Sequence, residues 1–126
     1  MNTLTEIFVF GSNLAGRHGA GAAKFAHEQH GAIYGKGIGL QGTSYAIPTK
    51  DVKLNTLPLD IIERYIIQFE KFAQAHPEYI FNVTPIGCGL AGYKYEDIAP
   101  LFKAYPNNVK LPKEFLDVIE ERELDE

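Results

Sequence analysis

The placement of glycine constrains this chain more than any other feature of its sequence. All twelve glycines lie in two windows, nine between Gly11 and Gly42 and three between Gly87 and Gly92. A glycine inside a helix or strand costs roughly 0.5–1 kcal/mol relative to alanine, so nine of them could approach the ~5–15 kcal/mol net stability of a whole domain. The windows therefore predict loops. Glycine-rich loops that follow strands let backbone N–H groups approach an anion closely.

Strand and helix patterns alternate around these loops. Short apolar runs predict strands at residues 7–10, 44–47, 79–83 and, more briefly, 109–111. Helices are expected at residues 20–30, 58–75, 96–103 (distorted by Pro100) and from Pro112 onward. Residues 35–42 hold too much glycine to predict regular structure. The alternation predicts an α/β fold with a mostly parallel sheet. Because ligands bind beyond the carboxyl ends of such strands, both glycine windows are expected to meet at one edge.

Length and composition predict one domain that spans residues 1–126. With 126 residues and 45% hydrophobic content, the chain can bury a core without disulfides. Cys88 is the only cysteine, and His27 and His30 have no carboxylate at matching spacing, so neither a metal nor a cofactor is expected. There is no signal-peptide pattern and no apolar run long enough for a membrane span, which predicts a cytoplasmic protein without membrane contact.

The net charge of −4 belongs to the end of the chain. Residues 113–126 carry seven acidic and two basic groups (−5), and the remaining residues carry ten basic and nine acidic groups (+1). This pattern predicts an acidic C-terminal helix and tail in which Phe115, Leu116 and Ile119 pack inward. It excludes the basic footprint of a general nucleic-acid binder. A scaffold role for the acidic helix stays open, and the sequence predicts no oligomeric state.

Three runs of the chain resemble the ligand-binding parts of macrodomains. Residues 8–14 and 19–23 resemble their first loop, which runs strand, small-small-Asn, glycines, helix. Residues 83–90, Val-Thr-Pro-Ile-Gly-Cys-Gly-Leu, resemble their second, phosphate-gripping loop. Residues 45–50 are similar to the strand ending in Thr-Lys of the branch that contains terminal ADP-ribose protein glycohydrolases and ADP-ribose readers. The resemblance covers residues 7–102.

The resemblance implies a three-layer αβα sandwich, a trimmed macrodomain, that binds ADP-ribose, a related nucleotide-ribose or an ADP-ribosylated macromolecule. It implies that Asn13 contacts the distal ribose and that the backbone of residues 87–90 wraps the diphosphate. Macrodomains commonly have an acidic residue before the first loop that helps to hold adenine, and here only Glu6 is available. The expected ligand-binding residues are Gly11, Ser12, Asn13, Gly19, Ala20, Gly21, Thr49, Ile86, Gly87, Cys88, Gly89, Leu90, Ala91, Gly92 and Tyr93.

The same resemblance implies a catalytic lysine. In the glycohydrolase branch the lysine of the Thr-Lys motif attacks the ribose anomeric carbon, and Lys50 matches it. The aspartate that follows Gly-Cys-Gly-Leu in that branch is replaced by Ala91, so Asp51, Glu96 or Asp97 would have to supply the acid that protonates the leaving group. Because Lys50 matches the catalytic lysine, hydrolysis of an ADP-ribosyl linkage is the first expectation. The alternative, which Ala91 favours, is a reader that binds ADP-ribose without catalysis.

Three loop residues admit other interpretations. His18, beside Arg17 in the first loop, is a candidate catalytic residue with Asn13 for processing an ADP-ribose phosphate, or else a solvent-exposed histidine. Asn13 itself has the alternative of closing a turn. Cys88 resembles a nucleophile in a strand-to-helix turn, but Gly-Cys-Gly lacks the Gly-x-nucleophile-x-Gly spacing, which favours a small side chain packed behind the loop.

Overall fold

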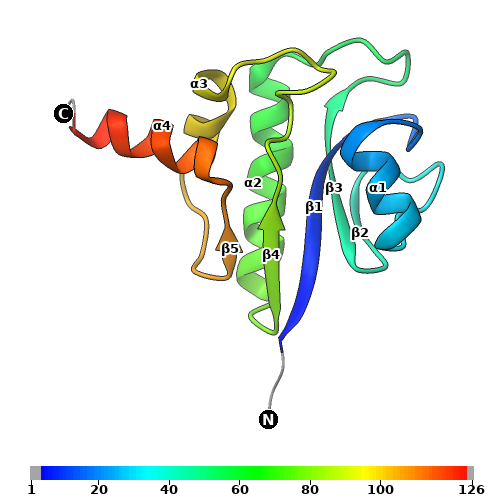
Figure 1. Cartoon of the computed structure of the whole chain (residues 1–126), viewed down its shortest axis with the longest axis horizontal. Helices are drawn as coiled ribbons and strands as arrows, with labels where there is room; N and C mark the ends of the chain where they lie inside the picture. Colours follow the sequence, from blue (N-terminus) through cyan, green and yellow to red (C-terminus); the bar gives the residue numbers. More distant parts are fainter. Residues whose placement is uncertain (1–3, 125–126) are drawn as a thin grey trace.

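A five-stranded, mostly parallel sheet organises the chain in the computed structural model, which describes residues 4–124 (Figure 1). The strands are β1 (Thr5–Asn13), β2 (Gly39–Gln41), β3 (Ser44–Lys50), β4 (Tyr79–Val83) and β5 (Val109–Lys110). The helices are α1 (Gly21–Gln29), α2 (Leu59–Ala75), α3 (Tyr95–Ile98) and α4 (Lys113–Leu124), with a 3-10 turn η1 at Ala99–Leu101. The strand order is β2-β3-β1-β4-β5, and only β2 runs antiparallel to its neighbour. The predicted α/β class is confirmed.

The alternation of side chains along β1 separates two apolar layers. Ile7 and Val9 pack with the buried face of α2, whereas Phe10 packs with Ala23 and Ala26 of α1. Successive strand residues point to opposite faces of a sheet, so α1 and α2 cover different faces (Figure 1). The result is compatible with a three-layer αβα sandwich.

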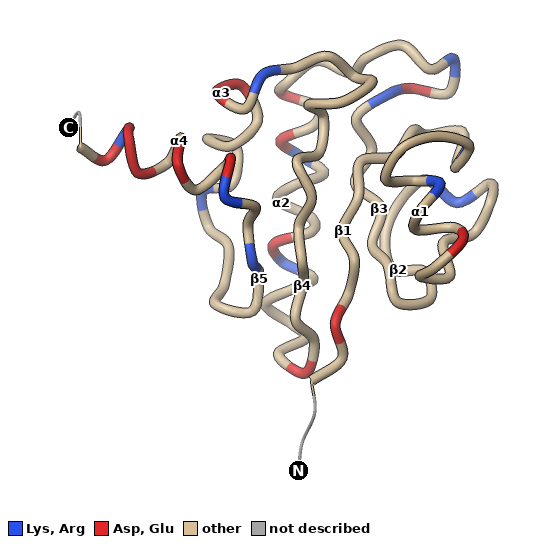
Figure 2. The backbone as a smooth tube through the Cα atoms, viewed as in Figure 1, with Lys and Arg blue, Asp and Glu red and all other residues tan. Residues whose placement is uncertain are grey.

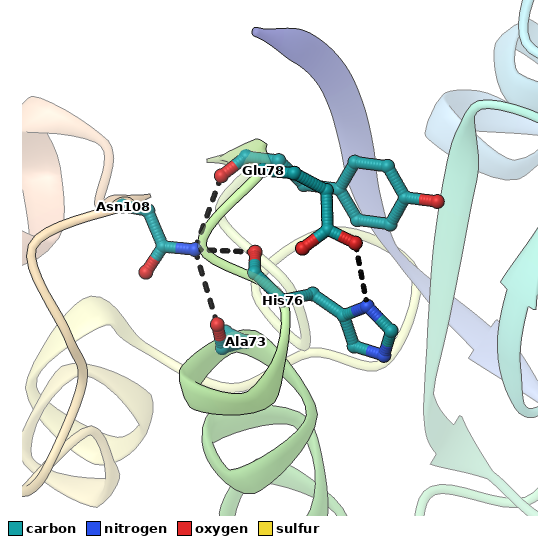
Figure 3. Close-up of polar contacts among 5 residues, drawn as sticks. Ala73, His76, Glu78 and Asn108 are labelled. Atoms are coloured by element: carbon teal, nitrogen blue, oxygen red, sulfur yellow. Dashed lines mark hydrogen bonds and ion pairs between the residues drawn. The ribbon is translucent and has the colours of Figure 1, made fainter.

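Helix α2 is anchored at its end as well as along its length. Its predicted stripe is fully buried at Ile62, Ile66, Phe69 and Ala73. Beyond the last turn, the amide of Asn108 donates to the carbonyl oxygens of Ala73, His76 and Tyr79 at 3.0–3.1 Å (Figure 3). Ala73 is the third residue from the end of α2, His76 follows its last residue, and Tyr79 begins β4. One side chain from the segment before β5 therefore fixes the junction between α2 and β4.

Several predicted boundaries need correction. Residues 39–41 form β2 at the sheet edge, where hydrogen bonding to β3 outweighs the flexibility of glycine. Strand β1 continues through Gly11 to Asn13, with an irregular register between Ser12 and Asn13, so the first loop begins later than predicted. The helix expected at 96–103 divides into α3 and η1, because Pro100 lacks the N–H that a continuous helix needs.

The C-terminal helix is acidic as predicted, but its buried face differs. Phe115 and Val118 are buried, while Leu116 is 37% exposed, so the inward position assigned to Leu116 is wrong. Residues at i, i+3 and i+4 share a helix face, which places Val118 and the partly buried Ile119 with Phe115. Acidic residues follow α4 outward from the sheet (Figure 2). Asp125 and Glu126 of the predicted tail lie outside the described residues.

Candidate functional site

A cleft of about 820 Å³ lies where β1, β3 and the loop after β4 come together. Both glycine windows line it, and a Cβ built on Gly11 would lie 3.4 Å from the backbone nitrogen of Gly87. The predicted meeting of the two windows at one sheet edge is therefore confirmed. Parallel strands end at the same edge, which is where an open α/β sheet binds ligands.

Most of the residues expected at a ligand site line this cleft. Those that line it are Gly11, Ser12, Asn13, Gly19, Ala20, Gly21, Thr49, Lys50, Ile86, Gly87, Gly89, Leu90 and Ala91. Those that do not are His18, Cys88, Gly92 and Tyr93. The lining residues that the sequence reasoning did not predict are Arg17, Ala22, Ala23, Tyr34, Leu54, Thr84 and Pro85.

The N-terminus of α1 opens into the cleft without a cap. Ala20 occupies the N-cap position and forms no side-chain cap hydrogen bond, and the first backbone bond of the helix runs from Lys24 to the Ala20 oxygen. The N–H groups of Gly21, Ala22 and Ala23 therefore have no acceptor inside the helix. These residues all line the cleft. Free N–H groups and the helix dipole together favour an anion at this position. Ala20 stands at an N-cap position where Ser, Thr, Asp or Asn is usual, and this was the feature of the sequence that could have indicated an uncapped helix end.

The loop after β4 presents a second set of free donors. Within residues 4–124, the N–H groups of Gly87, Gly89, Leu90 and Ala91 meet no acceptor. By contrast, three other N–H groups bond within the loop: Cys88 donates to Pro85, Gly92 to Gly89 and Tyr93 to Gly87. Of residues 87–90, which were expected to wrap a diphosphate with their backbone, Cys88 is therefore the one whose N–H group is not free.

The fold constrains position 87 to glycine, whereas it places no such constraint on position 89. Gly87 has a φ of +76°, and an added Cβ would lie 2.9 Å from Ile98 Cδ1, so backbone and packing both require it. Gly89 lies outside the left-handed region, and nothing in the described protein lies within 4 Å of an added Cβ. Neither conformation nor packing accounts for glycine at position 89. Its effect is to leave open space beside a free N–H group on the cleft wall.

Asn13 closes the first loop, which is the alternative weighed from the sequence. Its Oδ1 accepts from the Arg17 N–H and its Nδ2 donates to the Arg17 oxygen, both at 2.9 Å. Each end of the amide keeps one further hydrogen-bonding position for a ligand. Asn13 therefore shapes the loop that it belongs to while still lining the cleft.

His18 is buried beneath the loop and does not reach the cleft. Its side chain is only 1% exposed, its Nε2 donates to the Lys36 oxygen at 3.1 Å, and its ring packs edge-on against Phe10. Its Nδ1 is buried and has no hydrogen-bond partner among residues 4–124. The interpretation of His18 as an exposed loop residue is wrong, and a catalytic contact between His18 and a substrate does not fit this placement.

Among residues 4–124, the charged side chains that line the cleft are those of Arg17 and Lys50, and none of these lining residues carries a carboxylate. The suggested acids serve backbone groups instead: Asp51 accepts from Lys53 and Asn55, and Asp97 accepts from Lys94, all at 2.9 Å. Glu96 is exposed outside the cleft. The cleft is therefore electrostatically suited to an anion and holds no carboxyl group positioned as a general acid.

Glu6 lies near the start of β1, at the opposite end of the strand from the cleft, and so cannot contact a ligand there. It is the second residue of the strand, pairs with Ile80 at the start of β4, and accepts from Asn82 Nδ2 at 3.1 Å. The cleft lies at the opposite end of β1. Tyr34, Leu54 and Leu90 line the cleft, and Glu6 does not.

Cys88 is a half-buried thiol rather than an activated nucleophile. Its sulfur lies 3.4 Å from the Ile86 oxygen. Burial, together with the negative charges of Asp97, Glu96 and Glu114, raises the pKa of Cys88 to about 11. Because the thiolate is the reactive form, Cys88 is unsuited to nucleophilic catalysis near neutral pH. Among residues 4–124, no three His, Cys, Asp or Glu side chains group as metal ligands.

Comparisons of this chain with protein-family models, with curated proteins and with solved structures find no match. No helix in the described part of the chain is both long enough and apolar enough to cross a membrane.

Proposed function

We propose that this chain binds ADP-ribose, or a closely related nucleotide-ribose, in the cleft between its two glycine windows. The observation that carries the proposal is the convergence of two sets of free backbone N–H groups on a cleft whose charged side chains are both cationic. A hydrogen bond to a charged group contributes about 1.5–3 kcal/mol. Two or three such bonds would hold a diphosphate without an arginine cluster.

The size and lining of the cleft favour a nucleotide over a phosphate alone. Its volume of about 820 Å³ falls in the usual range for small-molecule sites of roughly 300–1,000 Å³. Tyr34, Leu54 and Leu90 add uncharged surface to the donors of the glycine loops. The resemblance of three runs to macrodomain loops then selects ADP-ribose from among the compounds that join a diphosphate to sugar and base.

Binding without turnover is the form of this proposal that the geometry supports best, because no carboxylate of the described part of the chain lines the cleft. Hydrolysis of an ADP-ribosyl linkage is the second candidate, and Lys50 favours it by lining the cleft at the end of β3. A lysine nucleophile must lose its proton, and the leaving group needs an acid within reach. Processing of an ADP-ribose phosphate through His18 is not proposed, because His18 is buried away from the cleft.

Calorimetric titration of the purified chain with ADP-ribose tests the proposal. We expect saturable binding of one ligand per chain and a rise in melting temperature with ligand concentration. Absence of both heat and thermal shift at millimolar ADP-ribose would refute it. Release of ADP-ribose from a modified protein, compared between wild type and Lys50→Ala, then separates the two forms. Release that is lost in Lys50→Ala supports the hydrolase, whereas no release or equal release leaves Lys50 without a catalytic role.

A further inference from the structure

The loop between β3 and α2 contains an unfavourable backbone conformation at the rim of the cleft. Leu54 has a φ of +67° and is the only non-glycine residue with positive φ among residues 4–124. A bulky residue rarely adopts this left-handed conformation, which glycine and asparagine tolerate far better. Such a conformation persists only where the surrounding structure enforces it, and it is concentrated at functional sites.

Hydrogen bonds from both ends of the loop enforce the conformation of Leu54. The Asp51 carboxylate accepts the N–H groups of Lys53 and Asn55 at 2.9 Å, and the Asp51 N–H donates to the Asn55 oxygen at 2.8 Å. The Thr56 hydroxyl donates to the Ala91 oxygen at 2.9 Å. This last bond ties the loop to the donor-bearing loop after β4, beside which it runs (Figure 1). Leu54 is therefore held at a fixed position relative to the phosphate-binding donors.

Leu54 also exposes apolar surface to water, in addition to its unfavourable backbone conformation. Leu54 lines the cleft with 40% of its surface exposed, and Leu90, which also lines it, is 74% exposed. We call these two residues the leucine rim. Removal of apolar surface from water lowers the free energy. A glycine at position 54 would relieve the backbone, and the exposed part of Leu54 is apolar surface that a ligand in the cleft can cover.

We propose that Leu54 is a specificity-determining residue that, with Leu90, covers an uncharged ring of the ligand while the glycine loops hold its phosphates. This inference rests on the proposed function and narrows it. The cleft selects phosphate compounds that carry a planar, uncharged group such as a nucleobase, and discriminates against ring-free phosphates. Because the leucine rim contains no charged group, it offers no ion pair to a charged group of the ligand at this position.

Two variants of Leu54 and one control in the same loop test this inference. Leu54→Gly and Leu54→Asn both remove the apolar side chain and both tolerate positive φ, so relief of the backbone offsets part of the packing that the covered portion of Leu54 provides. Thermal melting of each free variant checks that it is folded. We expect each to weaken ADP-ribose binding about three- to eightfold, the loss from leaving two fifths of a leucine uncovered. Affinity for inorganic diphosphate is expected to stay unchanged. Val52→Asn, at an exposed position that does not line the cleft, should bind both compounds as wild type does.

The outcomes separate this inference from the proposal beneath it. Wild type that fails to bind ADP-ribose refutes the proposed function before any variant is made. Wild type that binds ADP-ribose, with both Leu54 variants binding it equally well, overturns the inference alone. Parallel losses for ADP-ribose and diphosphate would also overturn it, because Leu54 would then act through the shape of the loop rather than by contact with a ring.

Discussion

Replacement of Gly89 by alanine should separate ligand binding from stability. Gly89 lines the cleft, has an N–H group without an acceptor among the described residues, and would place an added Cβ in open space. The methyl group would therefore meet no protein atom and would occupy the volume next to a donor. Gly87→Ala is the matched contrast, because its Cβ would lie 2.9 Å from Ile98 on a backbone with φ of +76°.

The expected magnitudes follow from these surroundings. A glycine-to-alanine change without strain stabilises a protein by about 0.4–1 kcal/mol through the unfolded chain. For a chain of 126 residues, that corresponds to a rise in melting temperature of about 1.5–4 °C. Loss of one hydrogen bond to a charged phosphate costs about 1.5–3 kcal/mol, which weakens binding about 10- to 150-fold. Gly87→Ala should lower both affinity and stability.

Differential scanning calorimetry of the free proteins, with titration of ADP-ribose into each variant, measures both effects. The reasoning holds if Gly89→Ala melts no lower than wild type and binds at least tenfold more weakly. Wild-type affinity in Gly89→Ala would refute the assignment of this wall of the cleft to the diphosphate. A lower melting temperature would refute the claim that position 89 is free of packing constraints.

Further predictions concern the scaffold. Asn108→Ala should lower the free energy of unfolding, measured in urea, by about 1–3 kcal/mol. Asn108→Asp should lower it further, because its carboxylate would face three carbonyl oxygens. The reverse order would contradict the assigned bonds. Burial raises the pKa of Glu70, and its Oε2 accepts a hydrogen bond from the Ala104 N–H at 2.9 Å. Glu70→Gln should therefore keep or raise the free energy of unfolding at pH 7, whereas Glu70→Ala should lower it by about 1–3 kcal/mol. Equal effects of the two variants would exclude the bond. Burial also raises the pKa of Tyr45 to about 12, and that of Cys88 is about 11, so the native state retains protons that the unfolded chain releases. Stability should therefore fall above about pH 9, with a shallower decline in Cys88→Ala, and constant stability from pH 8 to 11 would contradict this.

The parts of the fold predicted correctly are those whose pattern is local. Strand β4 was predicted with its observed bounds because an apolar run lies between Pro77 and the turn at Pro85. Strand β2 was missed because three residues containing a glycine carry no pattern of their own. Its hydrogen bonds come from pairing with β3, a tertiary contact that a sequence window does not contain.

The candidate site divides in the same way. The glycine windows predicted where the cleft lies, but the free and the paired N–H groups depend on loop geometry, as Cys88 shows by donating to Pro85. Tyr34 lies in the first glycine window but outside the runs that resemble macrodomain loops, and Leu54 lies outside both windows. His18 is buried because its ring packs on Phe10 and bonds to Lys36, eighteen residues away. Such contacts belong to the folded chain as a whole.

Titration of isotope-labelled protein with ADP-ribose, followed by backbone amide chemical shifts, tests the role of the cleft most directly. The largest shifts are expected at the free N–H groups of α1 and of the loop after β4, namely those of Gly21, Ala22, Gly89 and Leu90, with the amides of α4 unmoved. Spectra without change at millimolar ligand, or changes centred on α4, would contradict the proposal that these donors form one anion-binding site.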